Sequence, residues 1–399
     1  MAPLLRALAG LLVVATAARA QPPAELRLVG PTDETERITG IYCEEVDACV
    51  VTAQAGFSEG HLYATDGHDI TATLLTSDSA LGEVFGLIGA PDLVGFTKVG
   101  ETLFVNVAGA AGALLSATGN VTSPDAWTAS TLGAPDGRDS FGGNQQVGLG
   151  TDGAIWLLFT RGMIYTADDG PAPGTVWYET WAPTPPSEVP GDIGQLARAD
   201  PTLCIASPSF GVAPALLQMA YVAPDLSLII YPAGARNQMG TAEPGVCVST
   251  DGGQRFHHVR FPDVEGDLGP LGVTCLGEVC LAYGGLENEP TSTYIYVTHD
   301  AGAGATATWT RSQLPRLRED ARFRAAALTA GGQVGWVVGA VGAAAPLALV
   351  TEDGGATWTD VSALVRAHAP ETRLHAVHLF DESHVWIGGE NGLLLSGGY

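Results

Sequence analysis

The sequence predicts an all-β protein that folds as a single β-propeller of four-stranded blades. Three observations indicate this fold. A short turn motif recurs along the chain at nearly constant spacing. The composition includes 52 Gly and 25 Pro with only 15% charged residues, which is typical of many short strands joined by tight turns. Helical periodicity is nearly absent, because even the best helical candidate, residues 317–328, fits a loop and a strand equally well.

The turn motif has two close copies, which read VSTDGGQRF at residues 248–256 and VTEDGGATW at residues 350–358. Weaker copies begin at residues 63, 165 and 297, and worn or truncated copies lie near residues 118 and 397. Most neighbouring copies are about 45 to 53 residues apart, which is the length of a four-stranded blade. We therefore expect seven blades, with six or eight as alternatives.

Each copy has the residue types of a hairpin turn. An Asp carboxylate there can accept N–H groups of its own turn, glycine supplies positive φ angles, and an aromatic residue can pack back onto the hairpin. We therefore interpret these residues as structural and not catalytic. The residues given this role are Asp66, Asp169, Asp251, Gly253, Asp300, Asp353, Gly355 and Trp358.

The spacing of the copies also indicates where the chain departs from regular blades. The interval between the copies near residues 168 and 251 is about 30 residues longer than the others, so we place an insertion near residues 207–244, with an eighth blade as the alternative. The last copy ends before a fourth strand. The strand-like residues 25–29 are expected to supply that strand and close the ring, which makes residues 21–399 one propeller domain.

The first 20 residues have the pattern of a signal peptide. Arg6 precedes an apolar run at residues 8–18, and residues 18–20 form a small-x-small cleavage site. No later run is apolar and long enough for a transmembrane helix. We therefore expect an exported protein, periplasmic or extracellular, without a membrane span.

The six cysteines fit this location, since an even number favours disulfides in an oxidising compartment. Two close pairs bracket tight hairpins, and the other two cysteines lie in separate strand-like runs. The predicted disulfides are Cys43–Cys49, Cys275–Cys280 and Cys204–Cys247. A zinc site is the weaker alternative, because the spacings are not C-x2-C.

The charge balance excludes some classes of partner. The chain has 43 acidic and 18 basic residues, a formal net charge of −25. Such a surface repels nucleic-acid phosphates and anionic membranes. We therefore expect no nucleic-acid partner.

Four features with catalytic or metal-binding associations stand in the wrong context. The G-x-S-x-G match at residues 56–60 lies between two strands, whereas a nucleophile elbow needs a strand, a turn and a helix. The G-x-G-x-x-G match at residues 148–153 precedes a strand and not a helix. His375 and His378 are expected on opposite faces of one strand, and the acidic residues 263–267 are interpreted as a solvated loop rather than a calcium site. We expect no catalytic residue, no cofactor and no metal ion.

The repeats resemble two groups of propellers. The turn motif is similar to the Asp box, or BNR repeat, S-x-D-x-G-x-T-W, of the sialidase-like propellers. The unit VHLFDESHVWIGGENGLLL at residues 377–395 is similar to that of the photosystem II assembly and stability factors. Those factors are seven-bladed, and their exported bacterial relatives often carry a cysteine pair across the first hairpin.

These resemblances imply a scaffold more than an activity. A sialidase would have an early Arg-Ile-Pro motif, three arginines that hold the substrate carboxylate, and a Tyr–Glu pair. The first blade, read from Ile38, has no Arg-Ile-Pro. The arginine-rich binding surface of the photosystem II factors is also not evident in so acidic a chain.

The sequence thus predicts an exported, monomeric, non-enzymatic propeller that acts as a binding or assembly module of the cell envelope. Its ligand would be an unidentified protein or glycan. The alternative is a carbohydrate-active hydrolase of sialidase-like fold with a non-standard site, whose carboxylates would lie at the mouth of the central channel.

Overall fold

The computed structural model describes only part of the 399-residue chain. The described residues are 25–29, 35–56, 59–75, 92–108, 113–131, 145–149, 155–159, 164–167, 178–181, 221–222, 227–233, 245–250, 257–262, 270–284 and 293–398. Several predicted features lie outside them, namely the signal peptide, the acidic loop at residues 263–267, Asp169, Asp251, Gly253 and Cys204.

The described strands form seven four-stranded antiparallel sheets, each built from strands that follow one another in the chain, except that the last sheet also takes up β1. The first three sheets consist of β2 (Glu36–Glu45), β3 (Ala48–Ala55), β4 (Glu59–Thr65) and β5 (Ile70–Leu75); β6 (Asp92–Val99), β7 (Thr102–Ala108), β8 (Ala113–Thr118) and β9 (Trp127–Thr131); and β10 (Gln145–Leu149), β11 (Ile155–Phe159), β12 (Ile164–Ala167) and β13 (Tyr178–Trp181).

The other four sheets continue the same order along the chain. They consist of β14 (Tyr221–Val222), β15 (Ile229–Ala233), β16 (Gly245–Ser249) and β17 (His257–Arg260); β18 (Pro270–Leu276), β19 (Val279–Gly284), β20 (Tyr294–Thr298) and β21 (Thr310–Arg311); β22 (Ala321–Leu328), β23 (Gly335–Val341), β24 (Ala345–Thr351) and β25 (Thr359–Asp360); and β26 (Leu374–Leu379), β27 (Val385–Gly389), β28 (Leu394–Gly398) and β1 (Glu25–Leu28).

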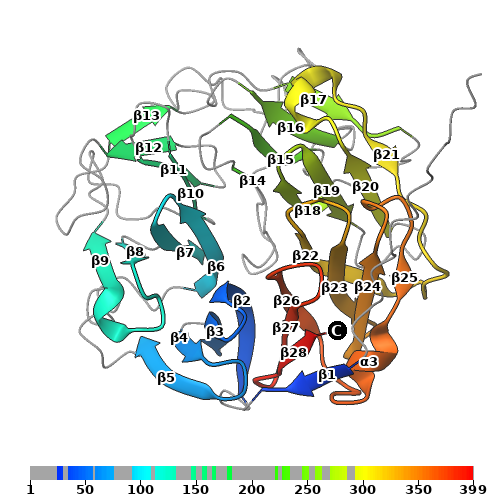
Figure 1. Ribbon diagram of the computed structural model, residues 1–399. Helices are drawn as coiled ribbons and strands as arrows, with labels where there is room; N and C mark the ends of the chain where they lie inside the picture. Colours follow the sequence, from blue (N-terminus) through cyan, green and yellow to red (C-terminus); the bar gives the residue numbers. More distant parts are fainter. Residues whose placement is uncertain are drawn as a thin grey trace, which may run out of the picture.

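The sheets are arranged around a central axis in chain order (Figure 1). The strand nearest the centre, called the inner strand below, is β2, β6, β10, β14, β18, β22 or β26, and β1 lies at the outer edge of the last sheet. Between the neighbouring sheets whose side chains the structure describes, apolar side chains fill the space. Trp386 and Leu394 of the last sheet, for example, pack with Ile38 and Val51 of the first. The prediction of an all-β propeller is therefore confirmed.

The chain ends meet in the last sheet. β1 pairs with β28 from Glu25 opposite Gly398 to Leu28 opposite Leu395, and the Val29 N–H donates to the Leu394 carbonyl at 2.9 Å. Leu26 is buried against the sheet of β22–β25, and Val29 is buried against the sheet of β2–β5. Residues 25–29 therefore hold the last sheet to both of its neighbours.

One sequence expectation differs from the structure. Residues 221–222 and 229–233 lie inside the expected insertion, yet they are β14 and β15, which extend the sheet of β16 and β17. The extra length of the chain therefore precedes β14, between Trp181 and Tyr221. Of the two alternatives left open for residues 317–328, the structure has the loop and strand: residues 317–320 are a loop, and residues 321–328 are β22, in which buried and half-exposed residues alternate over most of its length. In the described ranges no helix is long and apolar enough to cross a membrane.

Candidate functional site

The inner strands of five sheets share a one-residue bulge near their start. Pairing with the second strand skips one residue each time, and the skipped residues are Thr39, Val94, Leu271, Arg324 and His375. The residue that follows is Gly or Ala in every case, since the inner strands are crowded. A Cβ built on Gly40 would lie 2.4 Å from the Gly95 Cα of the next sheet. Bulges of this kind re-aim a side chain, and in two sheets that side chain is Arg or His.

Arginines gather where three neighbouring inner strands begin. Arg37 is in β2, Arg322 and Arg324 are in β22, and Arg373 immediately precedes β26. All four are half-exposed, and the sheets of β22, β26 and β2 are adjacent in the ring. The positive charges of Arg324 and Arg37 both act on His375. An acidic chain therefore places a concentration of positive charge at one mouth of its ring, which we call the arginine mouth.

His375 and Glu390 form the polar centre of the arginine mouth. His375 Nε2 and Arg373 Nη1 each lie 3.4 Å from Glu390 Oε1. Burial lowers the pKa of His375 to about 4, with Arg324 and Arg37 adding to the effect, so its ring is neutral at pH 7. The hydrogen bond from His375 is the main reason that the pKa of Glu390 lies below its usual value. Glu390 is therefore a carboxylate that holds the Arg373 cation and the neutral His375 ring in place.

A second polar group lies beside Arg37 and involves Glu36, which is only 1% exposed. The Tyr63 hydroxyl donates to Glu36 Oε1 at 2.6 Å, and His61 Nδ1 contacts the same oxygen. The Glu36 carbonyl accepts the Gly392 N–H at 2.8 Å, which ties the group to the loop that carries Glu390. A buried carboxylate that accepts from a tyrosine can anchor side chains, and it has the composition of a Tyr–Glu nucleophile pair.

His378 lies further along β26 and has different partners. Its Nε2 accepts the Cys43 N–H at 3.3 Å, and its ring lies 5.9 Å from that of Tyr42. Burial lowers its pKa to about 4. The two histidines thus share no partner, and the described residues contain no group of three or more side chains suited to a metal ion.

We expect the two histidines to make the protein less stable as the pH falls from 6.5 to 4. In the folded state both pKa values are about 4, whereas the unfolded chain titrates near 6.5, so in this window the unfolded state binds more protons and is favoured. The loss is on the order of 2 kcal/mol per histidine. Denaturant unfolding at pH 7.0, 5.5 and 4.5 measures it. The variants His375→Gln and His378→Gln should each flatten the dependence; an equally steep curve in both would contradict it.

The turns at Asp353 and Asp300 share one hydrogen-bond pattern. Asp353 Oδ1 accepts the Thr351 hydroxyl at 2.8 Å and the Thr357 N–H at 2.8 Å. Asp300 Oδ1 accepts the Thr298 hydroxyl at 2.6 Å and the Thr308 N–H at 2.9 Å. A tryptophan follows each pattern, and the Trp358 Nε1 donates to the Gly355 carbonyl at 3.2 Å. Gly355 has a φ of +89°, which favours glycine there.

The turn at Asp66 is different. Asp66 Oδ1 accepts the His68 and Asp69 N–H groups, both at 2.9 Å, and Thr65 is its direct neighbour instead of lying two residues before it. This is an ordinary Asx turn. The motif copies therefore do not all form the same turn.

We expect Asp353→Ala to reduce the free energy of unfolding by on the order of 1 to 2 kcal/mol, since three donors lose their acceptor. The affected donors are the Thr351 hydroxyl and the Thr357 N–H and hydroxyl. Urea unfolding of the variant measures the loss. Asp353→Asn, which keeps one carboxamide oxygen, should lose less, and equal stability of wild type and Asp353→Ala would contradict the role.

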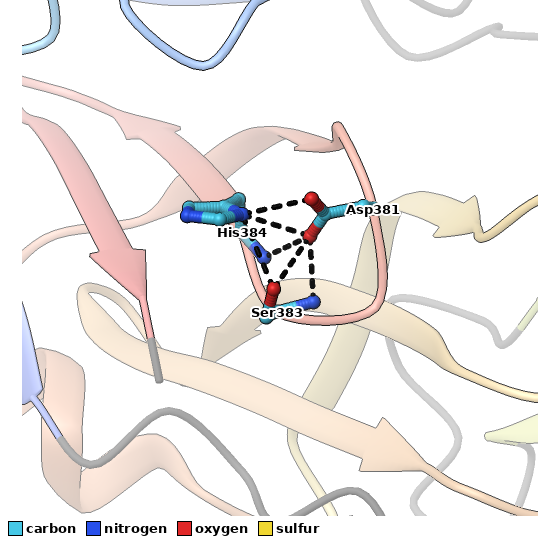
Figure 2. A network of polar contacts seen from close by, with 3 residues as sticks. All are labelled: Asp381, Ser383 and His384. Atoms are coloured by element: carbon cyan, nitrogen blue, oxygen red, sulfur yellow. Dashed lines mark hydrogen bonds and ion pairs between the residues drawn. The ribbon is translucent and has the colours of Figure 1, made fainter.

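Asp381, Ser383 and His384 have the residue types of a hydrolase triad but not its geometry (Figure 2). A triad histidine faces the acid with one ring nitrogen and the nucleophile with the other. Here His384 Nδ1 lies 2.8 Å from Asp381 Oδ1 and 3.2 Å from Ser383 Oγ, and the Ser383 hydroxyl donates directly to Asp381. Asp381 also accepts the N–H groups of both residues. The three residues stabilise the β26–β27 turn.

Two of the predicted disulfides are present among the described residues. Cys43 pairs with Cys49 and Cys275 with Cys280, and each bridge crosses the hairpin between an inner strand and the second strand of its sheet. Cys247 is also disulfide-bonded; its predicted partner, Cys204, lies outside the described residues.

The arginine mouth is missing from the sequence-based prediction. A sequence pattern that could have indicated it is an apolar residue, one variable residue and then Gly or Ala, as in Phe323-Arg324-Ala325 and Leu374-His375-Ala376. The variable residue is the one at the bulge. In the first blade, Arg37 stands directly before Ile38.

No protein-family model and no curated protein matches the chain. Solved structures do. YCF48 from Cyanidioschyzon merolae has a TM-score of 0.58 at 13% identity, covering 94% of this chain and 99% of that one. YCF48 bound to D1 peptide has a TM-score of 0.55 at 12% identity, covering 95% and 98%. The GH74 xyloglucanase from Xanthomonas campestris has a TM-score of 0.57 at 15% identity, covering 94% of this chain and 53% of that one. At these identities the likeness shows a β-propeller and no activity.

Proposed function

We propose that this chain is an exported, monomeric, non-enzymatic β-propeller of the cell envelope that binds or assembles a protein or glycan partner through the arginine mouth. In this proposal the seven sheets are seven blades of one ring, residues 1–20 are a signal peptide, and the turn motifs at Asp300 and Asp353 are Asp boxes. The two disulfides within hairpins support an oxidising location.

The observation that carries the proposal is the convergence of Arg37, Arg324 and Arg373 from three sheets around one buried histidine and one carboxylate. Fixed guanidinium groups bind carboxylates and other anions through paired hydrogen bonds. The site therefore suits an anionic group of the partner. That one YCF48 structure holds a D1 peptide gives a precedent for a peptide ligand on this fold.

One observation favours the hydrolase alternative, namely the Tyr63–Glu36 hydrogen bond beside Arg37. A tyrosine paired with a carboxylate and flanked by arginines is the set of groups that sialidase chemistry uses. Glu36 is fully buried, however, and Tyr63 already donates to it. We therefore assign the pair an anchoring role, in which it fixes the inner strand that carries Arg37.

The two functions are separated by a turnover screen of the mature chain against sialosides, xyloglucan oligosaccharides, aryl glycosides and esters. We expect no turnover above that of a heat-unfolded sample. Turnover that survives repurification and is abolished by both Tyr63→Phe and Glu36→Gln, with unchanged melting temperatures, would replace the binding module by an enzyme.

A further inference from the structure

A second candidate surface lies on the face of the ring opposite the arginine mouth. It consists of five hairpin turns, β2–β3, β6–β7, β18–β19, β22–β23 and β26–β27, each of which follows the far end of an inner strand. We call these turns together the hairpin face.

Neighbouring turns, or the strand ends next to them, lie close to one another. Lys98, before the β6–β7 turn, pairs with Glu44 of β2 at 2.9 Å, and the Cys43 N–H bonds to His378 of β26. A Cβ built on Gly331 would lie 3.8 Å from Glu382 Oε1, and one on Gly332 would lie 2.6 Å from Val279 Cγ2. The five turns are thus linked in sequence around the inner part of the ring.

The hairpin face carries most of the exposed large apolar side chains. Four such side chains are exposed in the described part of the chain. Val46 and Phe380 lie in these turns, and Leu276 ends β18, directly before the β18–β19 turn. The fourth, Leu28, lies on β1 at the outer edge of the last sheet. The three side chains lie at three separate turns of one face, so each can serve as an apolar anchor for a partner that spans several turns.

Each of the three turns is held in a fixed shape. A disulfide crosses the turn of Val46 and another crosses that of Leu276. The turn after Phe380 is fixed by the hydrogen bonds of Asp381 in Figure 2, whose Oδ1 accepts the Ser383 N–H at 2.7 Å and the His384 N–H at 2.8 Å. A surface already ordered before binding loses less conformational entropy when a partner docks.

The charge of the hairpin face selects the partner. Exposed carboxylates surround the apolar side chains, and they belong to Glu45, Asp47, Glu101, Glu278 and Glu382. Within β2, β6, β18 and β26 next to their turns, and in the five turns themselves, the described residues include one lysine or arginine, Lys98, and Glu44 neutralises it. Arg27 of β1 lies near the β2–β3 turn, since a Cβ built on Gly67 would be 3.6 Å from its Nη2 and 3.7 Å from the Val46 carbonyl, so five exposed carboxylates face one further cation. Complementarity therefore requires cationic groups on the partner together with apolar side chains.

We propose that the hairpin face docks a segment of a partner protein that is rich in Lys or Arg and carries apolar anchor residues. The chain would then bind two partners of opposite charge on its two faces. This inference goes beyond the proposed function and does not rest on it, because none of the residues that form the hairpin face belongs to the arginine mouth.

Binding of three synthetic peptides to the mature chain, measured by fluorescence anisotropy, tests the proposal. The peptides are an alternating Lys/Leu peptide, a Lys/Ser peptide without apolar groups, and a Glu/Leu peptide of opposite charge. We expect saturable binding of the Lys/Leu peptide, at least about tenfold tighter than that of the Lys/Ser peptide. The Glu/Leu peptide, which the arginine mouth can bind, should keep its affinity in variants of the hairpin face. The triple variant Val46→Ser, Leu276→Ser, Phe380→Ser and the double variant Glu45→Lys, Glu382→Lys should each weaken binding of the Lys/Leu peptide at least about tenfold.

Leu28→Ser is the matched control, since it removes an exposed apolar side chain away from the hairpin face. It should leave affinity for the Lys/Leu peptide unchanged, whereas Arg324→Gln with Arg373→Gln, which lowers the positive charge of the chain, should leave that affinity at least as tight. Equal binding of the Lys/Ser peptide, equal losses with Leu28→Ser, or wild-type affinity in the charge-reversed double variant would overturn the proposal. Sedimentation that showed a dimer weakened by both the arginine and the glutamate variants would also overturn it, because the occupant would then be a second copy of the chain.

Discussion

Removal of β1 is expected to open the ring. A chain that begins at Thr35 lacks the pairing of Glu25–Leu28 with β28 and the buried side chains of Leu26 and Val29. Two buried aliphatic side chains contribute about 1.5 to 3 kcal/mol each, and each lost backbone hydrogen bond adds about 1 kcal/mol. The expected loss, at least about 5 kcal/mol, approaches the whole stability of many domains.

The measurement is urea unfolding of the chain from residue 21 and the chain from residue 35. A synthetic peptide of residues 21–34, added in trans, should restore stability in proportion to its concentration. Leu28→Ser, on the same strand but exposed, should change stability by less than about 0.5 kcal/mol. Equal stability of the two chains would show that β1 does not hold the ends together.

Replacement of Trp386 by Ala is expected to cost about 3 to 5 kcal/mol. Trp386 lies in β27, is 2% exposed, and packs between the last and first sheets with Ile38, Val51 and Leu394. The cavity would form at the junction where the ring closes, so we expect the variant to lose cooperativity of unfolding as well as stability. Phe380→Ala, which alters an exposed aromatic side chain, is the control, and similar losses in the two variants would contradict the packing.

Much of the fold could be predicted from the spacing of the turn motif. A turn that recurs at the length of one four-stranded blade indicates that the chain repeats the same small sheet several times. Residues 25–29, which read as a strand, are expected from the sequence to complete the last sheet, and Glu25–Leu28 pairs with β28. The insertion was placed wrongly within the long interval between the motif copies near residues 168 and 251. The apolar residues of β15 would look like a strand both in an insertion and in a regular sheet, and the sequence does not show on which side of β14 the extra residues lie.

The arginine mouth could not be derived in the same way. Arg37, Arg324 and Arg373 are up to 336 residues apart in the sequence (373 − 37), and only ring closure brings their sheets together. The bulges at Arg324 and His375 also break the alternation of strand residues. A prediction that assumes strict alternation therefore assigns these two side chains to the wrong face of the sheet. The low pKa of His375 arises from burial and from charges on other sheets, which no local pattern encodes.

The arginine mouth is tested most directly by the affinity of a Glu-rich peptide for the mature chain, measured at 50 and 200 mM salt. We expect saturable binding that weakens at the higher salt, since exposed charge attraction is screened. Arg324→Gln with Arg373→Gln should weaken it at least about tenfold, while Glu45→Lys with Glu382→Lys on the other face leaves it at least as tight. Wild-type affinity in the double arginine variant, with an unchanged melting temperature, would contradict a binding function at this mouth.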